Sequence, residues 1–168
     1  MAPKKRINTR DLIEKIQTLA RAKMSAQSVV SLDQVRNLNP KKEPDPKVIL
    51  VIEDDETMRS AMKRIFESDG FKVIMAADGT QLSTVLDDSP LDLIILDIGL
   101  PWINGIELAQ LMKQNSDLKK LPLIFVSGKT SSEEMKMAFD VGADDFIKKP
   151  FDVEKLKKTV RTLLKLAE

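Results

Sequence analysis

The chain has 168 residues, of which 27 are Lys or Arg and 26 are Asp or Glu, and its formal net charge is +1. It contains no Cys and no His. This composition excludes a disulfide framework, an ordinary zinc site and any nucleophile pair that needs an imidazole. Any chemistry must use carboxylates, hydroxyls, Lys or Arg, and the metal that suits such groups is a hard cation such as Mg²⁺.

The apolar runs are short. The run at residues 48–52 is typical and lies far below the ~18 residues that a membrane span needs. Residues 1–6 are basic, but no apolar stretch follows them, so the sequence predicts no signal peptide. We therefore expect a cytoplasmic protein without membrane insertion, built as one domain with an additional segment.

The two ends of the chain differ in charge. Residues 1–46 carry 10 basic and 5 acidic side chains, whereas residues 47–168 carry 17 basic and 21 acidic ones. Between them, residues 39–46 contain three prolines among alternating charges, a pattern that blocks both helices and sheet ladders. The predicted organisation is a basic extension over 1–38, partly helical or disordered, a Pro-rich linker over 39–46 and a folded domain over 47–168.

The extension contains one amphipathic pattern. Apolar residues recur at helical spacing, Asn8 is placed to cap the helix, and Ile7 and Leu12 are placed as a hydrophobic staple. A weaker second turn is predicted from Ser31. Two short helices cannot close a core alone, so this segment either docks on another surface or frays. The apolar positions are Leu12, Ile13, Ile16, Leu19, Ala20 and Met24.

Downstream of the linker, short apolar runs alternate with helical patterns. Continuously apolar runs predict parallel strands that are covered on both faces. Five such units in about 120 residues predict an α/β domain with a doubly wound, five-stranded parallel sheet of flavodoxin-like order 2-1-3-4-5. The predicted strands are 48–52, 71–75 at an edge, 93–96, 123–126 and 145–147, and the predicted helices are 56–68, 80–87, 105–114, 131–141 and 153–166.

Polar side chains follow four of these strands. Glu53 and Asp54 follow the first strand, Asp97 the third, Ser127 the fourth and Lys149 the fifth. In the order 2-1-3-4-5 these strands are neighbours, and their carboxyl ends meet at one edge of the sheet. The sequence therefore predicts one pocket that holds several carboxylates, a hydroxyl and an ammonium group.

Four stretches carry a family resemblance: VILVIEDDETMR, LDLIILDIGLPWINGIEL, PLIFVSGKT and GADDFIKKPF. Together they resemble the receiver domain of two-component response regulators over residues 47–168, and not over residues 1–46. The resemblance implies that Asp97 is the phosphoacceptor. It also implies that Glu53, Asp54, Asp97 and the main-chain carbonyl of Gly99 hold Mg²⁺.

The resemblance assigns the remaining site residues as well. Ser127 corresponds to the switch hydroxyl, Lys149 to the lysine that meets the phosphoryl group, and Phe146 to the switch aromatic, where Tyr is frequent. Lys149 precedes what in this family is usually a cis-proline. Gly99 and Lys129 occupy positions that influence how fast the phosphoryl group is lost, and the sequence sets no direction for that rate.

Each residue also has a purely structural interpretation. Asp54 or Asp55 alone would most often cap the following helix, as Asp152 is expected to cap the last one. Ser127 alone would be a turn hydroxyl, Lys149 alone a solvated charge and Phe146 alone a packing residue. Their arrival together at four strand ends favours the functional interpretation.

The sequence thus predicts a phosphorylation-controlled switch that is not an enzyme beyond its own phosphorylation and dephosphorylation. A histidine kinase or phosphotransfer protein would supply the phosphoryl group, because the chain has no His of its own. The response would appear at the surface of the fourth helix, fifth strand and fifth helix of the domain. Because Glu168 ends the chain just after the last predicted helix, we expect a stand-alone receiver that binds a downstream protein, with a homodimer left open.

Three alternatives remain at this stage. The protein could be a phosphorylation-independent adaptor, or a DNA-binding regulator that uses a basic arm. Docking of the extension is favoured over nucleic-acid binding, because acidic residues are interspersed among the basic ones and no DNA-binding fold fits the segment. A phosphatase is disfavoured, because Gly99 stands where a second carboxylate would be needed two residues after Asp97. The arm would consist of Lys4, Lys5, Arg6, Arg10, Arg21 and Lys23.

Overall fold

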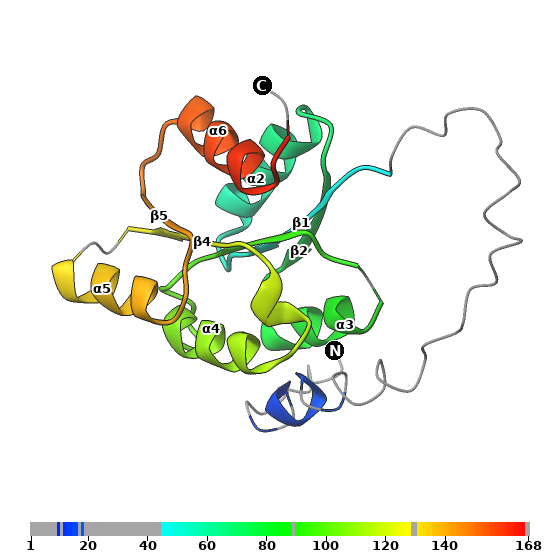
Figure 1. The fold of residues 1–168 in the computed structure, drawn as a ribbon, viewed down its shortest axis with the longest axis vertical. Coiled ribbons are helices and arrows are strands. Elements are labelled where there is room, and N and C mark those ends of the chain that lie inside the picture. Colours follow the sequence, from blue (N-terminus) through cyan, green and yellow to red (C-terminus); the bar gives the residue numbers. More distant parts are fainter. Residues whose placement is uncertain are drawn as a thin grey trace, which may run out of the picture.

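A five-stranded parallel sheet forms the centre of the protein in the computed structural model (Figure 1). The strand order is β2-β1-β3-β4-β5, which confirms the predicted order 2-1-3-4-5. The strands are β1 (Val48–Ile52), β2 (Lys72–Ala76), β3 (Leu93–Leu96), β4 (Leu123–Ser127) and β5 (Asp145–Lys148). The structure describes residues 10, 12–16, 18, 45–88, 90–128 and 131–166.

Helices cover both faces of the sheet. Two of them, α2 (Glu56–Glu67) and α6 (Val153–Leu163), lie on one face (Figure 1). The other face carries α3 (Gly79–Asp88), α4 (Gly105–Gln114) and α5 (Ser132–Asp140), and a short 3-10 helix, η2 (Leu118–Lys120), precedes β4. Within the described part of the chain, none of the helices is long and apolar enough to cross a membrane.

The strands form because their side chains alternate between two apolar clusters. In β1, Leu50 and Ile52 point to the cluster under α3, α4 and α5, whereas Ile49 and Val51 point to the cluster under α2 and α6. Every residue of β1 is buried. A strand that is buried on both faces requires a continuous apolar run, which is why the runs at 48–52 and 93–96 predict the strand bounds correctly.

Side-chain caps fix where the helices begin. Asp55 accepts a hydrogen bond from the Met58 amide at 2.7 Å, and Asp152 accepts one from the Lys155 amide at 2.9 Å. The expected cap at Asp152 is therefore present, and of the two candidate caps Asp54 and Asp55 it is Asp55 that caps α2. This leaves the Asp54 carboxylate available at the sheet edge.

Apart from β1, β3 and α4, the predicted boundaries differ from the observed ones by one to three residues, and two of the differences have a clear physical reason. Strand β2 begins at Lys72 and not at Phe71, because the Phe71 amide donates to the Phe66 carbonyl at 3.1 Å and closes the turn after α2. Helix α6 ends at Leu163, three residues before the predicted end, where Leu164 caps it and Lys165 adopts a positive φ of 55°. A positive φ does not continue a right-handed helix.

A short helical stretch of the extension packs on the domain. Residues 12–16 are helical, and Leu12 and Ile16 are buried in the apolar cluster of α3 and α4. The side-chain amide of Asn115 donates to the Ile16 carbonyl at 2.7 Å. These contacts support docking of the extension. The predicted cap at Asn8, the apolar positions at 19, 20 and 24, the second turn from Ser31 and most of the linker lie outside the described residues.

Candidate functional site

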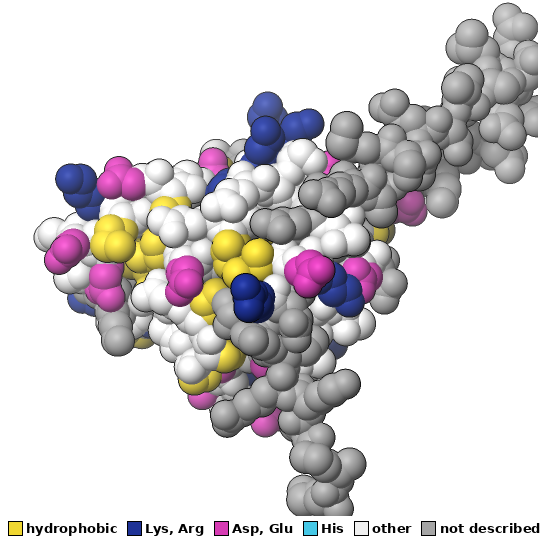
Figure 2. All heavy atoms as spheres, turned by 90° about the horizontal axis from the view of Figure 1, so that it is seen from below, with side chains coloured by type: hydrophobic (Ala, Val, Ile, Leu, Met, Phe, Trp, Pro, Cys, Tyr) yellow, Lys and Arg dark blue, Asp and Glu magenta, His cyan; other side chains and the backbone are white. Residues whose placement is uncertain are grey.

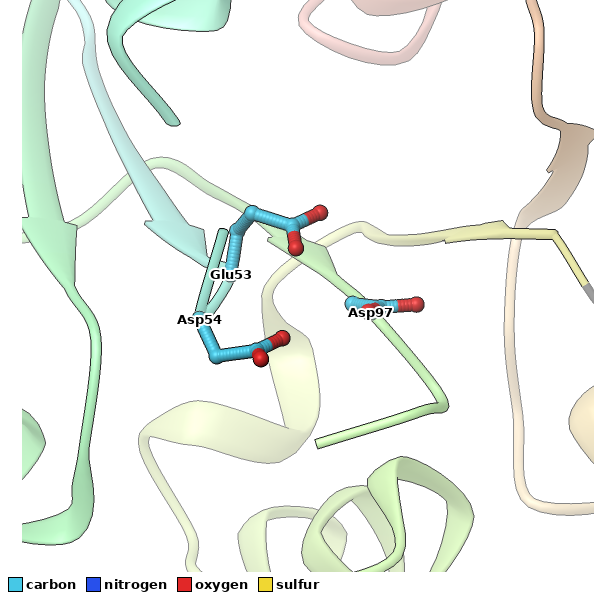
Figure 3. Close-up of side chains that lie close together, drawn as sticks. All are labelled: Glu53, Asp54 and Asp97. Carbon is cyan, nitrogen blue, oxygen red and sulfur yellow. The ribbon is translucent and has the colours of Figure 1, made fainter. Parts of the chain in front are cut away.

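Three carboxylates meet at the carboxyl edge of the sheet. Glu53 and Asp54 follow β1, and Asp97 follows the neighbouring β3 (Figure 3). The Asp97 amide donates to the Ile52 carbonyl at 3.0 Å, so the ladder between the two strands continues into the site. One oxygen from each of the three carboxylates lies within 4.8 Å of the others. The predicted acidic cluster therefore forms.

The three acids differ in burial. Glu53 is 2% exposed and Asp97 is 8% exposed, whereas Asp54 is exposed. Burial raises the pKa of Glu53 above its usual value, and the negative charge of Asp97 adds to this, although the hydrogen bond from Lys149 opposes it. Crowded, poorly solvated carboxylates repel one another and gain from a nearby cation. The negative charge of the cluster therefore favours binding of a cation.

Lys149 supplies one such charge. It follows β5, and its Nζ lies 2.5 Å from Glu53 Oε2 and 3.5 Å from Asp97 Oδ2. Burial lowers the pKa of Lys149, but the hydrogen bond and charge of Glu53, together with Asp97, outweigh burial and raise it above its usual value. Lys149 therefore stays protonated and bridges the two acids. The Lys149–Pro150 peptide bond is cis.

Of the remaining predicted residues, Ser127 and Gly99 lie at the same edge, whereas Phe146 lies within β5. Ser127 is the last residue of β4 and is 1% exposed, and its carbonyl accepts the Lys149 amide at 2.9 Å. Phe146 pairs with Phe125 of β4 and is half-buried. The Gly99 amide donates to Asp97 Oδ1 at 3.3 Å, so this loop approaches the carboxylate closely. Lys129 lies outside the described residues.

Sequence reasoning missed Gly105. This residue begins α4, and its amide donates to the Ile98 carbonyl at 2.9 Å. A Cβ at this position would lie 2.3 Å from the Asp97 carbonyl oxygen and 2.6 Å from Ile98 Cα. Only glycine allows the helix to approach the loop after Asp97 so closely. The sequence does contain a signal for this close approach: a glycine in the first turn of a helix, four residues after the turn residue Pro101.

Arg59 was also missed. Its Nη1 donates to the carbonyl oxygens of Glu53 at 3.0 Å and Asp54 at 2.9 Å. The guanidinium therefore fixes the backbone that carries the acidic pair without touching either carboxylate. The sequence shows an Arg in the second turn of the helix that follows the acids, but this position is also typical of a solvated charge.

The donor set fits Mg²⁺. Mg²⁺ prefers oxygen ligands and is commonly held by one or two carboxylates with water completing its shell. Glu53, Asp54 and Asp97 offer carboxylate oxygens only, and Asp54 keeps the site open to solvent. The described residues at this edge include no thiolate or imidazole that would favour zinc or copper, since the whole chain has neither Cys nor His.

Comparison with known proteins agrees with this geometry. Residues 49–161 match the family model of the response regulator receiver domain. The aerobic respiration control protein ArcA of Escherichia coli is 34% identical over 116 residues, and the transcriptional regulatory protein CpxR of the same species is 35% identical over 117 residues. These matches cover 69% and 70% of this chain and 48% and 49% of the relatives, so the chain spans about half the length of the curated relatives it matches.

Solved structures show the same fold. The Vibrio cholerae chemotaxis protein CheY4 is 28% identical, with a TM-score of 0.65, and the match covers 70% of this chain and 98% of that chain. A CheY-like receiver domain protein from Methanospirillum hungatei is also 28% identical, with a TM-score of 0.66 and coverage of 71% and 94%.

Proposed function

Because the chain belongs to the response regulator receiver domain family, we propose that Asp97 is its phosphoacceptor and that Mg²⁺ is its cofactor. The observation that carries this proposal is the convergence of Glu53, Asp54 and Lys149 on Asp97 at one sheet edge. The donor would be a histidine kinase or a phosphotransfer protein. The receiver would then act as a cytoplasmic signalling switch.

The reaction proposed is a phosphoryl transfer between two proteins. A carboxylate oxygen of Asp97 attacks the phosphorus of a donor phosphohistidine, the P–N bond breaks, and the imidazole leaves with the electron pair. The product is an acyl phosphate on Asp97. Because attacking carboxylate and phosphoryl group are both negative, catalysis consists of positioning and charge neutralisation.

The residues around Asp97 have separate roles in this proposal. Mg²⁺ held by Glu53, Asp54, Asp97 and the Gly99 carbonyl would neutralise charge on the phosphoryl oxygens. The Lys149 ammonium, 3.5 Å from Asp97 Oδ2, would bind a phosphoryl oxygen by a charge-assisted hydrogen bond. Arg59 would hold the acidic pair in place through its two backbone contacts.

The output is proposed to be binding of a protein partner through α5, β5 and α6. The Ser127 hydroxyl would turn to the phosphoryl group, and Phe146 would move with it. Helix α5 exposes three large apolar side chains, with Met135 at 38%, Met137 at 46% and Phe139 at 47%. Exposed apolar side chains on one helix are typical of binding surfaces, and Met adapts readily to different partners.

The test is acyl phosphate formation at Asp97. We expect intact mass spectrometry to show a single phosphoryl adduct after treatment with acetyl phosphate and Mg²⁺. Beryllofluoride, an analogue of the aspartyl phosphate, should change the fluorescence of Trp102, the single tryptophan of the sequence. Both signals should be absent in Asp97→Asn and without Mg²⁺.

The matched control is Asp55→Asn. Asp55 lies beside the acidic pair, but its side chain caps α2, and Asn is an equally good cap. This variant should form the adduct like the wild type. An adduct that persists in Asp97→Asn would place the acceptor elsewhere, and a complete lack of adduct would make the protein a phosphorylation-independent adaptor.

A further inference from the structure

The helical stretch of the extension, of which the structure describes residues 10, 12–16 and 18, contacts a defined part of the domain surface. Leu12 is 2% exposed and Ile16 is 3% exposed, and both belong to the apolar cluster under α3 and α4. A Cβ at Gly79, the first residue of α3, would lie 3.8 Å from Leu12 Cδ2 and 3.3 Å from the Trp102 ring. Leu12 and Trp102 therefore both lie against the start of α3.

Polar contacts fix the position of this stretch on the domain. The Asn115 amide nitrogen donates to the Ile16 carbonyl, and Asn115 is 6% exposed. The Oδ1 of the same side chain accepts the amides of Asp117 and Leu118 at 2.9 and 3.1 Å. Lys15 adds an ion pair with Asp87 of α3 at 2.5 Å. The Asn115 side chain at the end of α4 is thus held in place by its own hydrogen bonds and donates from a buried position to the docked stretch.

The docked stretch is a peripheral layer and not an integral part of the sheet core. Of its described residues, only Leu12 and Ile16 are buried, while Arg10, Glu14 and Thr18 are exposed. Seen from the side of α3, α4 and α5, apolar side chains gather in patches between charged ones (Figure 2). Joining two binding elements in one chain raises their effective concentration to the order of millimolar, so even weak contacts are occupied.

Trp102 links this surface to the phosphoacceptor. It lies in the loop between Asp97 and Gly105, its ring contacts the start of α3, and its Nε1 donates to the Ala77 carbonyl at 3.3 Å. The loop has little freedom at its ends, because the Gly99 amide contacts Asp97 and the Gly105 amide bonds to Ile98. A phosphoryl group on Asp97 adds bulk and charge beside this loop, and a rearrangement of the loop would move Trp102 against the start of α3, where Leu12 also lies.

We propose that the face of α3 and α4 is a receptor for an amphipathic helix, that residues 10–18 of the same chain occupy it, and that phosphorylation of Asp97 releases them. The docked helix shares the start of α3 with Trp102 of the loop that follows Asp97, so a change in that loop alters the surface on which the helix packs. By linkage, undocking in turn favours the phosphorylated state. The release step rests on the proposed function, whereas the docking step does not.

The docking step is tested with Asn115→Asp in the full chain. The carboxylate keeps the Oδ1 acceptor for Asp117 and Leu118 but places an oxygen against the Ile16 carbonyl. We expect trypsin to cut after Lys15 at least tenfold faster and amide exchange to speed up over residues 10–18. The matched control is Asn104→Asp at the other end of α4, which keeps its cap on Ile106 and should leave both rates unchanged.

Two results would overturn the docking step. One is a cleavage rate after Lys15 that is unchanged in Asn115→Asp, or in Ile16→Asp if Asn115→Asp does not fold. The other is a wild-type protein that sediments as a dimer and becomes a monomer in Ile16→Asp, because the segment would then occupy the face of a second copy.

The release step is tested with Mg²⁺ and beryllofluoride on the wild type and on Asp97→Asn. We expect cleavage after Lys15 to rise about tenfold in the wild type and to stay constant in Asp97→Asn. If mass spectrometry shows the acetyl phosphate adduct but cleavage does not change, the coupling is wrong and the proposed function stands. If no adduct forms, the proposed function and the release both fail, while Asn115→Asp still decides the docking.

Discussion

The sheet and the docked helical stretch differ in how many of their side chains are buried. In β1, all five residues are buried between two helical layers. Among the described residues of the docked stretch, only Leu12 and Ile16 are buried, and burying one such side chain contributes about 1.5–3 kcal/mol. Ordering each residue costs about 1–2 kcal/mol, and this cost opposes the gain from the two buried side chains. Elements that respond to a signal are drawn from such low-stability parts of a protein.

The sharpest test of this difference compares Leu50→Ala with Leu12→Ala, since both leucines are 2% exposed or less. Leu50→Ala should lower the free energy of unfolding by about 3–5 kcal/mol, because it leaves a cavity in the sheet core. Leu12→Ala should lower it by no more than about 1 kcal/mol, since the loss cannot exceed the docking free energy itself. Urea denaturation measures both, and equal losses would contradict the distinction.

Gly105→Ala tests the contact between α4 and the phosphoacceptor loop. The added Cβ would lie 2.3 Å from the Asp97 carbonyl oxygen, so backbone atoms must move. We expect the free energy of unfolding, measured by urea denaturation, to fall by about 2–3 kcal/mol. We also expect slower phosphorylation of Asp97. Gly128→Ala is the control, because none of the described residues has an atom within 4 Å of its Cβ position and the expected change is within about 0.5 kcal/mol. A neutral Gly105→Ala would show that the loop is free to shift.

Lys149→Met tests how much positive charge the acidic edge needs. The substitution leaves Glu53 and Asp97 side by side without their bridging ammonium. In buffer without Mg²⁺ we expect the free energy of unfolding to fall by about 2 kcal/mol. Mg²⁺ at millimolar concentration should raise the melting temperature of both proteins, because it binds the folded state, and should raise that of the variant more. If Mg²⁺ raises the two melting temperatures equally, Lys149 and the cation do not both neutralise the same carboxylates.

The sequence predicts the strands and the site residues because both follow local rules. Continuous apolar runs define β1 and β3, and a parallel sheet brings the residues after its strands to one edge, which places Glu53, Asp54, Asp97, Ser127 and Lys149 together. The contact of Asn115 with Ile16 spans 99 positions and depends on how two surfaces meet, which no local pattern encodes. Gly105 and Arg59 act on backbone atoms that are near in the sequence, but a glycine in a first helical turn and an arginine on a helix are both common without such a contact.

An ion pair on the opposite face gives a pH test. Arg161 Nε donates to Asp69 Oδ2 at 2.9 Å, and this hydrogen bond lowers the pKa of Asp69 below its usual 3.8. A lowered folded-state pKa contributes stability above pH 3.8 that is lost as the pH falls through the folded value. Asp69→Asn should therefore melt at a lower temperature than the wild type at pH 6, and the difference should close in acid.

The control for this pair is Asp87→Asn, which removes the more exposed ion pair between α3 and the docked stretch. Exposed pairs contribute little and are screened by salt, so its melting temperature should stay near that of the wild type. If the melting temperatures of Asp69→Asn and the wild type differ by the same amount from pH 6 to pH 3, the variant has lost packing contacts and not a charge interaction.

The smallest expected effect concerns Ser83 on α3, within the layer that carries the docked stretch. Ser83 is 2% exposed, and in the described part of the chain its hydroxyl has no hydrogen-bond partner. An unsatisfied buried hydroxyl costs free energy, so Ser83→Ala should raise the free energy of unfolding by up to about 1 kcal/mol. Thermal unfolding measures it. A loss of stability would show that the hydroxyl has a partner, and faster cleavage after Lys15 in the same variant would place that partner in the docked stretch.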